Sequence, residues 1–478
     1  MQYPVVETGD IKASTHNNYQ NNFDRNELPT ELSKSLETDI EKSKAVKDAF
    51  KFVWKNYKEK AMGHDNIGPL SGQHSDNWNS WGITLVDSLD TLLLMDLEDE
   101  FKDAMETVKK INYKKSQSKF TVFEIIIRHL GGLIAAYDLS KEEILLSHAK
   151  DLADNLLPAF DSPFGYPVRH FNYGEKVSEN TQKINTLAEV GSLQLEFHRL
   201  SVITGDKRYA DIAQKIIDNV ESWELDIPGL YPLEFDITTN KPITKKISFG
   251  ALGDSFYEYL IKRYILMGGS EPQYKEMYQS SIKSLKEKLL VKKGNDLFLT
   301  ELDYNLKPNN EMDHLACFVP GMLMLSGVYL KEKEEYVIGK KLVKSCQMFY
   351  NQTATGLGPE KIGFDPKKDG VEGLDNIYRL RPETLESIYY AYKFTGDNEY
   401  REWAWRIFTA IERHCKGKYG YTEYKDVNSL GNDNQSDSME SYFLAETLKY
   451  LYLIFTPNTL DLSKYVFTTE AHPLLITQ

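Results

Sequence analysis

A short connection rich in glycine, aromatic residues and proline recurs along this 478-residue chain. It reads FGYP at 164–167, GLYP at 229–232, GLGPE at 356–360 and GYTE at 420–423, and LFLT at 297–300 lacks the glycine. Matching positions lie about 60–68 residues apart, which suits two helices and a turn. Such a unit buries its apolar faces only against neighbouring units, in an open solenoid or a closed ring. The missing glycine and the unequal spacings favour a closed barrel with functional loops.

The segments between these connections carry apolar residues at helical spacing, starting with Ala45, Phe50, Val53 and Tyr57 after Glu41. A second unit runs from 86 to 108. The remaining segments expected to be helical are 123–137, 145–157, 188–204, 209–223, 256–267, 274–290, 318–330, 336–350, 382–395, 400–414 and 440–455. About seven pairs result, so the sequence predicts an all-α barrel of helical hairpins.

Composition sets the domain limits and excludes some partners. Residues 1–38 are polar without a clear period and are interpreted as a flexible stem or linker, with one barrel domain at 39–478. A net charge of −14 and a pI near 5.3 leave no basic surplus for a nucleic acid.

No apolar run reaches the roughly 18 residues that span a bilayer. We expect a cytosolic protein, or one whose targeting segment or membrane anchor is missing from this sequence. Sequons at 351–353 and 434–436 favour the secretory pathway.

The chain ends with YVFTTEAHPL at 465–474 rather than with another helical segment. The run from Tyr465 to Thr469 is typical of a strand, which could enter the bore of a barrel. Thr468, Thr469 and Glu470 offer hydroxyl, carbonyl and carboxylate oxygens, the ligand set that suits Ca²⁺. An ordinary C-terminal strand with polar residues is the alternative.

Two carboxylates stand out by their neighbours. Glu124 lies among Phe123, Ile125 and Ile127, where its charged form is disfavoured, as a general acid requires. A solvent-facing pair with Arg128 at i+4 is the alternative. Asp254 follows a glycine-rich turn in GALGDSFYEYL, where capping of the next helix is the alternative.

A third carboxylate, Glu383, follows Pro382 in RLRPETLES, with Arg379, Arg381 and Glu386 nearby. A favourable interaction of Glu383 with the helix dipole is the structural alternative. Like Glu124 and Asp254, however, Glu383 lies near the start of an expected first helix of a pair. In a barrel such ends meet at one mouth, so the three carboxylates are predicted to share a site.

Six motifs in order resemble the class I α-1,2-mannosidases of glycoside hydrolase family 47. They are LVDSLDTL (85–92), FEIIIRHLGG (123–132), GALGDSFYEYL (250–260), RPETLES (381–387), SYFLAETLKYLYLIF (441–455) and FTTEAHP (467–473). The resemblance extends from about Ala45 to Leu474. It implies an (α/α)₇ barrel plugged by a C-terminal β-hairpin, with Ca²⁺ at the bottom of the site. It also implies an inverting exo-mannosidase that trims α-1,2-linked mannose from high-mannose N-glycans.

The resemblance assigns roles to individual residues. Glu124 matches the family's proposed general acid, Glu383 its proposed general base and Asp254 its third essential carboxylate, and the sequence leaves open which carboxylate is acid and which is base. Thr469 matches the threonine that binds Ca²⁺ through its hydroxyl and carbonyl oxygens. Residues matching polar or aromatic positions around the sugar and the ion's water ligands are Arg128, Glu189, His314, Arg381, Glu386, Tyr442, Phe443, Glu446 and Glu470. Inversion requires an acid and a base on opposite faces of the sugar, far enough apart to hold a water molecule.

The chain has three cysteines, Cys317, Cys346 and Cys415, whose pairing the sequence alone does not determine. The resemblance pairs Cys317 with Cys346 and leaves Cys415 free. Two reduced core thiols are the alternative.

Leu252 occupies a position where endoplasmic-reticulum members tend to carry arginine, so it suggests the Golgi and fungal subgroup and broader trimming. The resemblance therefore implies a monomer in the secretory lumen, with the Golgi preferred to the endoplasmic reticulum, or a secreted form. Two other classes remain open. One is a catalytically weak glycan-binding protein of glycoprotein quality control, and the other is a helical-repeat scaffold without cation dependence.

Overall fold

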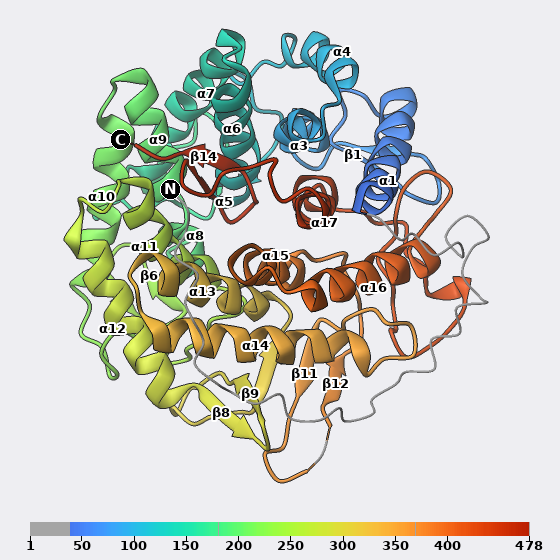
Figure 1. Cartoon of the computed structure of the whole chain (residues 1–478). Helices are drawn as coiled ribbons and strands as arrows, with labels where there is room; N and C mark the ends of the chain where they lie inside the picture. The colour runs from blue at the N-terminus through green and yellow to red at the C-terminus, as the bar shows by residue number, and fades with distance from the viewer. Residues whose placement is uncertain (1–38, 180, 369, 478) are drawn as a thin grey trace.

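The computed structural model describes residues 39–477, with residues 180 and 369 left out. The stem expected at 1–38 lies outside the described residues. Within them, the chain passes once round a ring, from α1 in blue to α17 in red, which packs against α1 and closes the ring (Figure 1). The expected closed barrel of helical hairpins is confirmed.

The outer layer of the ring consists of single amphipathic helices. In α10, for example, Tyr209, Ala213, Ile216, Ile217 and Val220 are buried along one face while the opposite face meets solvent. The outer helices among the described residues are α1 (Asp39–Lys60), α4 (Glu98–Val108), α7 (Glu143–Leu156), α10 (Arg208–Glu221), α12 (Pro272–Lys288), α14 (Lys333–Asn351) and α16 (Asn398–His414).

The inner layer is apolar on nearly every face because it packs both outward and into the bore. In α13 all residues from Val319 to Gly327 are buried. The inner elements are α2 (Ile83–Asp87) with α3 (Leu89–Leu94), α5 (Val122–Glu124) with η2 (Ile125–Leu130) and α6 (Gly131–Ser140), α8 (Leu187–Gly191) with α9 (Gln194–Thr204), α11 (Asp254–Leu266), η5 (Leu315–Phe318) with α13 (Val319–Tyr329), α15 (Glu383–Thr395), and η7 (Phe443–Thr447) with α17 (Leu448–Phe455). Short 3₁₀ turns are η3 (Leu157–Phe160), η4 (Val177–Glu179) and η6 (Asn432–Asn434).

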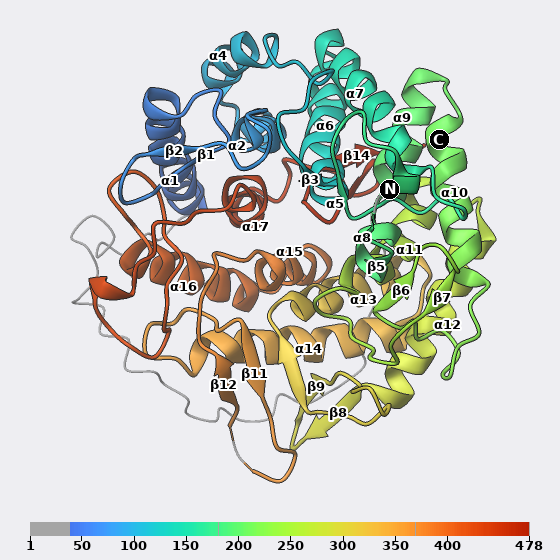
Figure 2. The ribbon, with the colours of Figure 1, turned by 180° about the vertical axis from the view of Figure 1, so that it is seen from behind.

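Short antiparallel strands occupy the connections between helices, several of them prominent from behind in Figure 2. The pairs are β1 (Asn66–Ile67) with β2 (His74–Ser75), β3 (Phe120–Thr121) with β4 (His170–Phe171), and β8 (Leu290–Lys293) with β9 (Asp296–Leu299). The three-stranded sheets are β5 (Ile184–Thr186), β6 (Glu234–Asp236) and β7 (Lys241–Pro242), and β10 (Glu311–Asp313), β11 (Lys361–Gly363) and β12 (Glu372–Asp375).

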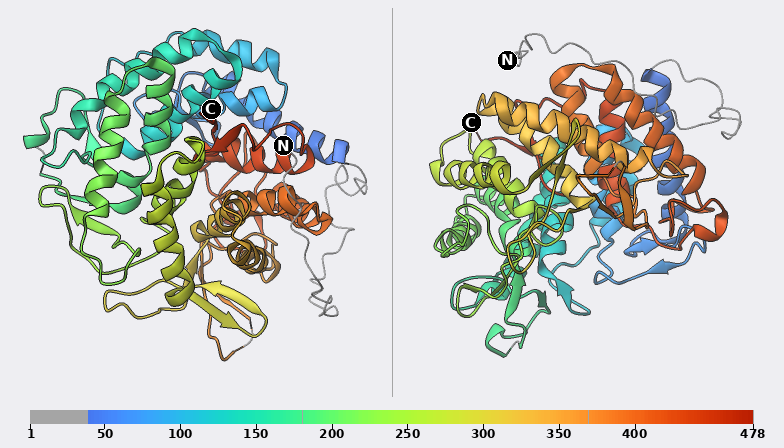
Figure 3. Two further views of the ribbon diagram at one scale, coloured as in Figure 1. Left: turned by 60° about the vertical axis from the view of Figure 1, so that its left-hand side comes forward. Right: turned by 90° about the horizontal axis from the view of Figure 1, so that it is seen from below.

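The C-terminal hairpin plugs the ring, as expected. Strand β13 (Tyr465–Phe467) pairs with β14 (Pro473–Leu475), with Phe467 opposite Pro473. The turn between them reaches inner helix α6, where a Cβ atom on Gly131 would lie 2.8 Å from Cδ2 of His472. A Cβ on the next residue, Gly132, would meet the backbone of Val86. The two glycines therefore allow the plug and α2 to approach α6. Figure 3 shows the ring from two further sides.

A disulfide joins Cys317 of η5 to Cys346 of α14, with Cα atoms 5.8 Å apart, and Cys415 is free and buried. This is the pairing that the resemblance implied. The bridge closes a loop of 29 residues between the inner and outer layers, worth about 3–4 kcal/mol in the chain-entropy account. In the part of the chain that the structure describes, no helix combines the length and apolar character needed to cross a membrane.

Candidate active site

A cavity of about 310 Å³ lies where the inner helices meet the plug turn. It is lined by most of the residues singled out from the sequence: Glu124, Arg128, Glu189, Leu252, Asp254, Arg381, Glu383, Tyr442, Glu446, Thr469 and Glu470. Residues far apart in the sequence therefore converge on one pocket at the centre of the ring.

The three predicted carboxylates reach this pocket from comparable places in the fold. Glu124 ends α5, Asp254 is the first residue of α11, and Glu383 is the first residue of α15. Gly253 rather than Asp254 occupies the N-cap of α11, so the capping interpretation of Asp254 was wrong. The oxygen Oδ1 of Asp254 instead accepts a hydrogen bond from the N–H of the following residue, Ser255, at 2.8 Å. The expected meeting of these helix ends at one mouth is confirmed.

Arg128 connects the wall of the pocket to the plug. Its Nε lies 2.8 Å from Oε2 of Glu124 and 3.7 Å from Oε1 of Glu470, and its Nη1 lies 3.2 Å from Oε2 of Glu440. Only 8% of its side chain is exposed, so the solvent-facing interpretation of the pair with Glu124 was wrong. The guanidinium also lies between the rings of Trp78 and Tyr442, 5.5 and 5.6 Å from their centroids.

Two of the helical segments that line the pocket contain a π-helical stretch. Element η2 follows Glu124 and includes Arg128, and η7 includes Glu446. A π-helical turn inserts one extra residue and re-aims the side chains around it, and such turns are frequent at functional sites. Here the irregular turns lie where two carboxylates and a guanidinium enter the bore.

The backbone at three points around the pocket adopts left-handed angles that side chains disfavour. Leu252 has φ 73°, Leu380 φ 62° and Ala471 φ 55°. Each lies within two residues of a pocket side chain, namely Asp254, Arg381 and Glu470. Strain of about 1–3 kcal/mol per residue persists only where the surroundings enforce it. The surrounding fold therefore holds these three pocket segments in fixed, costly conformations.

Burial and neighbouring carboxylates raise the pKa of two pocket carboxyl groups, Glu446 and Glu470. Burial, followed by the charge of Glu470, raises the pKa of Glu446 well above its usual value. Burial and the charge of Asp87 likewise raise the pKa of Glu470, and Oε1 of Glu470 has no hydrogen-bond partner among the described residues. Mutual repulsion of this kind is relieved by a proton, a cation or a ligand.

The carboxyl groups of Asp254 and Glu189 have pKa values raised toward neutral pH. Burial raises the pKa of Asp254 to about 7, with the charge of Glu258 adding to the effect. Burial also raises the pKa of Glu189 to about 7, although Arg169, 2.9 Å from it, opposes the shift. A carboxyl group with a pKa near 7 suits proton donation at neutral pH.

Thr469 lies in the plug turn at the bottom of this acidic pocket. Its one hydrogen bond among the described residues is donated by its N–H to Oη of Tyr259, at 3.2 Å. Its carbonyl and hydroxyl oxygens are therefore available for another ligand, next to the unmatched charges of Glu446 and Glu470. Hard oxygen donors among excess negative charge are the set that Ca²⁺ binds, so the residues present fit such an ion.

Three predicted residues lie behind the pocket rather than in its lining. His314 supports Glu383, with Nδ1 2.9 Å from Oε2 of that carboxylate. Glu386 is buried and lies 3.2 Å from Nζ of Lys262. Phe443 is fully buried and packs on Tyr421 with ring centroids 4.9 Å apart, so Tyr442 is the aromatic residue that faces the cavity.

Sequence reasoning missed other residues of the site. Arg169, which pairs with Glu189, lies in a connection between expected helices, and nothing in the local pattern marked it. Asp87 and Asp90 contact the two ring nitrogens of His472 at 3.0 and 3.1 Å. All three lie inside quoted motifs, LVDSLDTL and FTTEAHP, and two acids spaced three apart in an apolar helix could have indicated a buried polar contact.

Comparison with known proteins identifies first the fold class and then the family. The structure of a D-mannose isomerase has a TM-score of 0.57 and 15% identity, over 77% of this chain and 99% of that one, which shows a common fold alone. An α-1,2-mannosidase from Trichoderma reesei is much more similar, with a TM-score of 0.87 and 34% identity over 91% of this chain and 99% of that chain.

Sequence relatives agree with this structural match. A mannosyl-oligosaccharide 1,2-alpha-mannosidase of Arabidopsis thaliana is 38% identical over 92% of this chain and 79% of its own length. A mannosyl-oligosaccharide alpha-1,2-mannosidase of Coccidioides posadasii is 36% identical over 94% of both chains. Glycosyl hydrolase family 47 matches residues 49–476. The chain therefore belongs to glycosyl hydrolase family 47, and it is a glycosidase.

Proposed function

We propose that this protein is an inverting exo-α-1,2-mannosidase that trims α-1,2-linked mannose from high-mannose N-glycans with a bound Ca²⁺. The observation that carries the proposal is the convergence of Glu124, Asp254, Glu383 and Thr469 on one cavity. The family's relatives with this activity, at 36–38% identity over most of the chain, support the choice of bond and sugar.

The reaction adds water across the glycosidic bond. Glu383 acts as general base and removes a proton from the water that attacks the anomeric carbon. The imidazole of His314, with Nδ1 2.9 Å from Oε2 of Glu383, can donate a hydrogen bond to that carboxylate and orient it toward the water. On the opposite face, Glu124 gives a proton to the departing oxygen. Asp254, with its pKa of about 7, is the competing donor, and the pH profiles of Glu124→Gln and Asp254→Asn distinguish the two.

Thr469 would hold Ca²⁺ through its carbonyl and hydroxyl oxygens, with Glu446 and Glu470 near enough in the pocket to balance the charge. A bound Ca²⁺ supplies coordination for sugar hydroxyls and favours ring distortion toward the oxocarbenium-like transition state. Arg381 lines the opposite wall and is oriented by Glu360, which contacts its Nε at 2.7 and 2.9 Å. The position of Tyr442 at the cavity suits packing on a sugar ring.

Leu252 influences which glycan branches enter. It lines the cavity, is 39% exposed, and carries no charge that would select one branch. We therefore expect removal of several α-1,2-mannoses rather than one. A single released mannose would contradict this expectation, and Leu252→Arg should narrow the products of the wild-type enzyme.

The substrate implies the compartment. High-mannose N-glycans are carried by glycoproteins of the secretory pathway, so we propose that the protein acts as a monomer in that lumen, in the Golgi rather than the endoplasmic reticulum. Localisation of the native chain by immunofluorescence, and its mass by light scattering, test these two statements. A cytosolic signal or a stable dimer would contradict them.

The function is tested by NMR of a high-mannose glycan during digestion. We expect β-mannose as the first product, because inversion turns the α-anomer into the β-anomer, and we expect release to stop when Ca²⁺ is chelated. Release of α-mannose would contradict inversion, and release that persists with chelator would contradict the role of Ca²⁺. Glycan binding without release would favour a quality-control lectin instead.

A further inference from the structure

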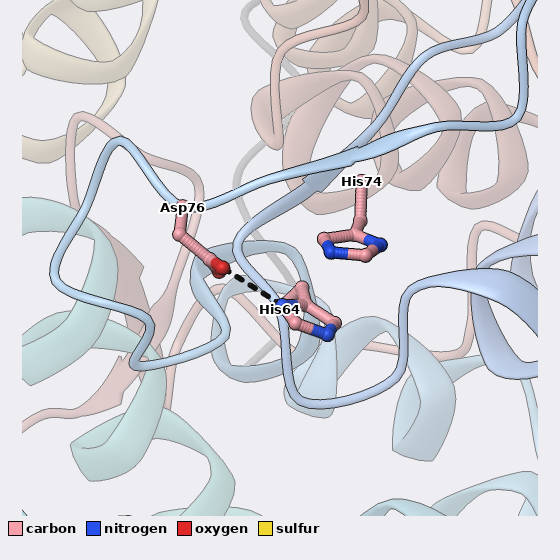
Figure 4. Close-up of side chains that lie close together, drawn as sticks. All are labelled: His64, His74 and Asp76. Atoms are coloured by element: carbon pink, nitrogen blue, oxygen red, sulfur yellow. Dashed lines mark hydrogen bonds and ion pairs between the residues drawn. The ribbon is translucent and has the colours of Figure 1, made fainter.

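A cluster of two histidines and an aspartate lies outside the active-site pocket, on the segment that joins α1 to α2. His64 precedes β1, His74 belongs to β2, and Asp76 follows β2 (Figure 4). One ligand atom from each residue lies within 4.8 Å of the other two. Figure 4 shows the three side chains turned toward one another.

The histidine rings are arranged face to face, with centroids 3.7 Å apart and planes inclined by 20°. Nδ1 of His64 lies 2.8 Å from Oδ2 of Asp76. Two imidazoles and a carboxylate are the donors that borderline divalent ions such as Zn²⁺ bind, whereas Ca²⁺ prefers oxygen alone. We propose that His64, His74 and Asp76 form a site for a divalent transition-metal ion, separate from the Ca²⁺ site of the pocket.

The backbone that carries these ligands is held rigidly by a neighbouring residue. Asp65 is fully buried, and its carboxylate accepts hydrogen bonds from the N–H groups of Trp78, Ser80, Gly82 and Ile83 at 2.6–3.3 Å. Its own N–H donates to Oδ1 of Asp76 at 3.2 Å. Asp76 therefore keeps one oxygen for the loop and turns the other toward the histidines.

The paired strands hold His74 in place, and β1 begins two residues after His64. Ile67 of β1 lies opposite His74 in β2, and the hairpin closes through the N–H of Gly68, which donates to the carbonyl of Gln73 at 2.8 Å. Asp437 accepts from the N–H groups of Leu70 and Ser71 and holds the tip of the hairpin. A preformed frame of this kind lowers the ordering cost of metal binding.

Completing a site requires one ring to turn, because an imidazole binds a metal in its own plane and the two stacked planes are nearly parallel. Ligand atoms about 2.1 Å from a Zn²⁺ ion lie about 3–3.5 Å from one another, so the exposed ring of His74 would turn out of the stack to share an ion with His64. His64 is 39% exposed, Asp76 33% exposed, and His74 is exposed, so an ion has access from solvent. Three protein ligands leave a fourth position for water.

The site would also stabilise one edge of the pocket. The segment continues from Asp76 to Trp78, whose ring lies 5.5 Å from the guanidinium of Arg128. A metal ion on Asp76 would therefore limit movement of a residue that packs on the pocket wall. This consequence is separate from mannose cleavage and does not depend on it.

The test uses the whole chain without a polyhistidine tag, kept saturated with Ca²⁺ while Zn²⁺ is titrated by calorimetry. We expect one Zn²⁺ per chain, and we expect His74→Ala and Asp76→Asn each to weaken binding by at least about tenfold, as loss of a ligand should. His170→Ala, a histidine on β4, is the matched control and should bind Zn²⁺ as the wild type does.

A second measurement keeps the result interpretable if a variant folds poorly. Substitution of Co²⁺ for Zn²⁺ in the wild-type chain should give the visible absorption of a four-coordinate site, and the band should disappear in His74→Ala. Because His74 is exposed, its replacement leaves the core intact, which the thermal unfolding curve verifies. Equal Zn²⁺ affinity in the wild type and in His74→Ala, or displacement of Zn²⁺ by Ca²⁺, would overturn the proposal.

Discussion

The bore of the barrel contains two groups of buried carboxylates, and they differ in their partners. Asp90 lies 2.7 Å from Nζ of Lys449 and 3.1 Å from Nδ1 of His472, and Asp87 lies 3.0 Å from the other nitrogen of the same ring. At the pocket, by contrast, burial and the charge of Glu470 raise the pKa of Glu446, and burial and the charge of Asp87 raise that of Glu470 against the opposing charge of Arg128.

The first group, Asp87 and Asp90, stabilises the fold, whereas Glu446 and Glu470 in the pocket are placed to meet a ligand. We call Asp87 and Asp90 the matched group, because each has a cationic or imidazole partner. The matched group joins the plug to α2 and α3 through His472, and Lys449, the partner of Asp90, also donates to the carbonyl of Ala471 in the plug turn at 2.6 Å. A buried charge that already has a partner gains little from binding a ligand, because its desolvation is already offset. Unmatched carboxylates are costly in the isolated chain, and they become favourable only when a cation and a substrate arrive.

The largest effect should come from removing Glu383, the pocket carboxylate that we propose as general base. Glu383→Gln should lower kcat by about 10²- to 10⁴-fold, because a general base is lost, while the midpoint of thermal unfolding changes little. Mannose release under substrate saturation measures it. Glu372→Gln, an exposed carboxylate on β12, is the control, and a fall of similar size in that variant would contradict the assignment.

Breaking the matched group should affect folding. Lys449→Met leaves Asp90 buried without its cation, so we expect the free energy of unfolding to fall by about 3–5 kcal/mol. Urea denaturation measures the change. Lys344→Met removes the partner of Asp296 at the surface, where the pair is worth at most about 1 kcal/mol. Equal losses in the two variants would show that the plug contacts are no stronger than surface pairs.

Supplying the cation should stabilise the unmatched group. At 100 times its dissociation constant, a ligand bound only to the folded chain adds about 2.7 kcal/mol, so Ca²⁺ should raise the unfolding temperature and chelation should lower it. Thr469→Val preserves the shape of the side chain and should lose this response. An unfolding temperature that does not change with Ca²⁺ would favour a helical scaffold instead.

The smallest effect concerns Glu196, a fully buried carboxyl group beside the bore. Burial raises its pKa from the usual 4.5 to about 8, and its Oε1 accepts a hydrogen bond from Oη of Tyr259 at 2.7 Å. The folded chain therefore binds this proton more tightly than the unfolded chain does. Its contribution to stability is fully present below pH 4.5 and is lost as the pH rises through about 8.

Glu196→Gln should remove that dependence and make the chain more stable than the wild type at pH 8, where the wild-type carboxyl group begins to lose its proton. Urea midpoints measured between pH 5 and pH 9 test it. A parallel loss of stability in both proteins across that range would mean that Glu196 does not titrate there.

Much of the site could be predicted because residues close together in the sequence determine where a helix begins. Pro382 before Glu383 and the glycine-rich turn before Asp254 placed both carboxylates at helix ends, and the repeated connections brought those ends to one mouth. Local patterns failed for Arg169, which reaches Glu189 from a connection, and for Asp254, whose capping role was taken by Gly253. Each failure concerns a contact set by packing rather than by neighbours in sequence.

The sequence by itself determined the ring of hairpins, the position of the plug and the acids at the helix ends, because periodicity and turn residues act over a few positions. Only the tertiary structure decided which acids are matched. His472 meets Asp87 and Asp90 across separations of 385 and 382 residues, and the cluster of His64, His74 and Asp76 depends on a hairpin closed around Asp65. The interaction between two charges depends on their distance in space. That distance is set when the chain folds and is not given by their separation in the sequence.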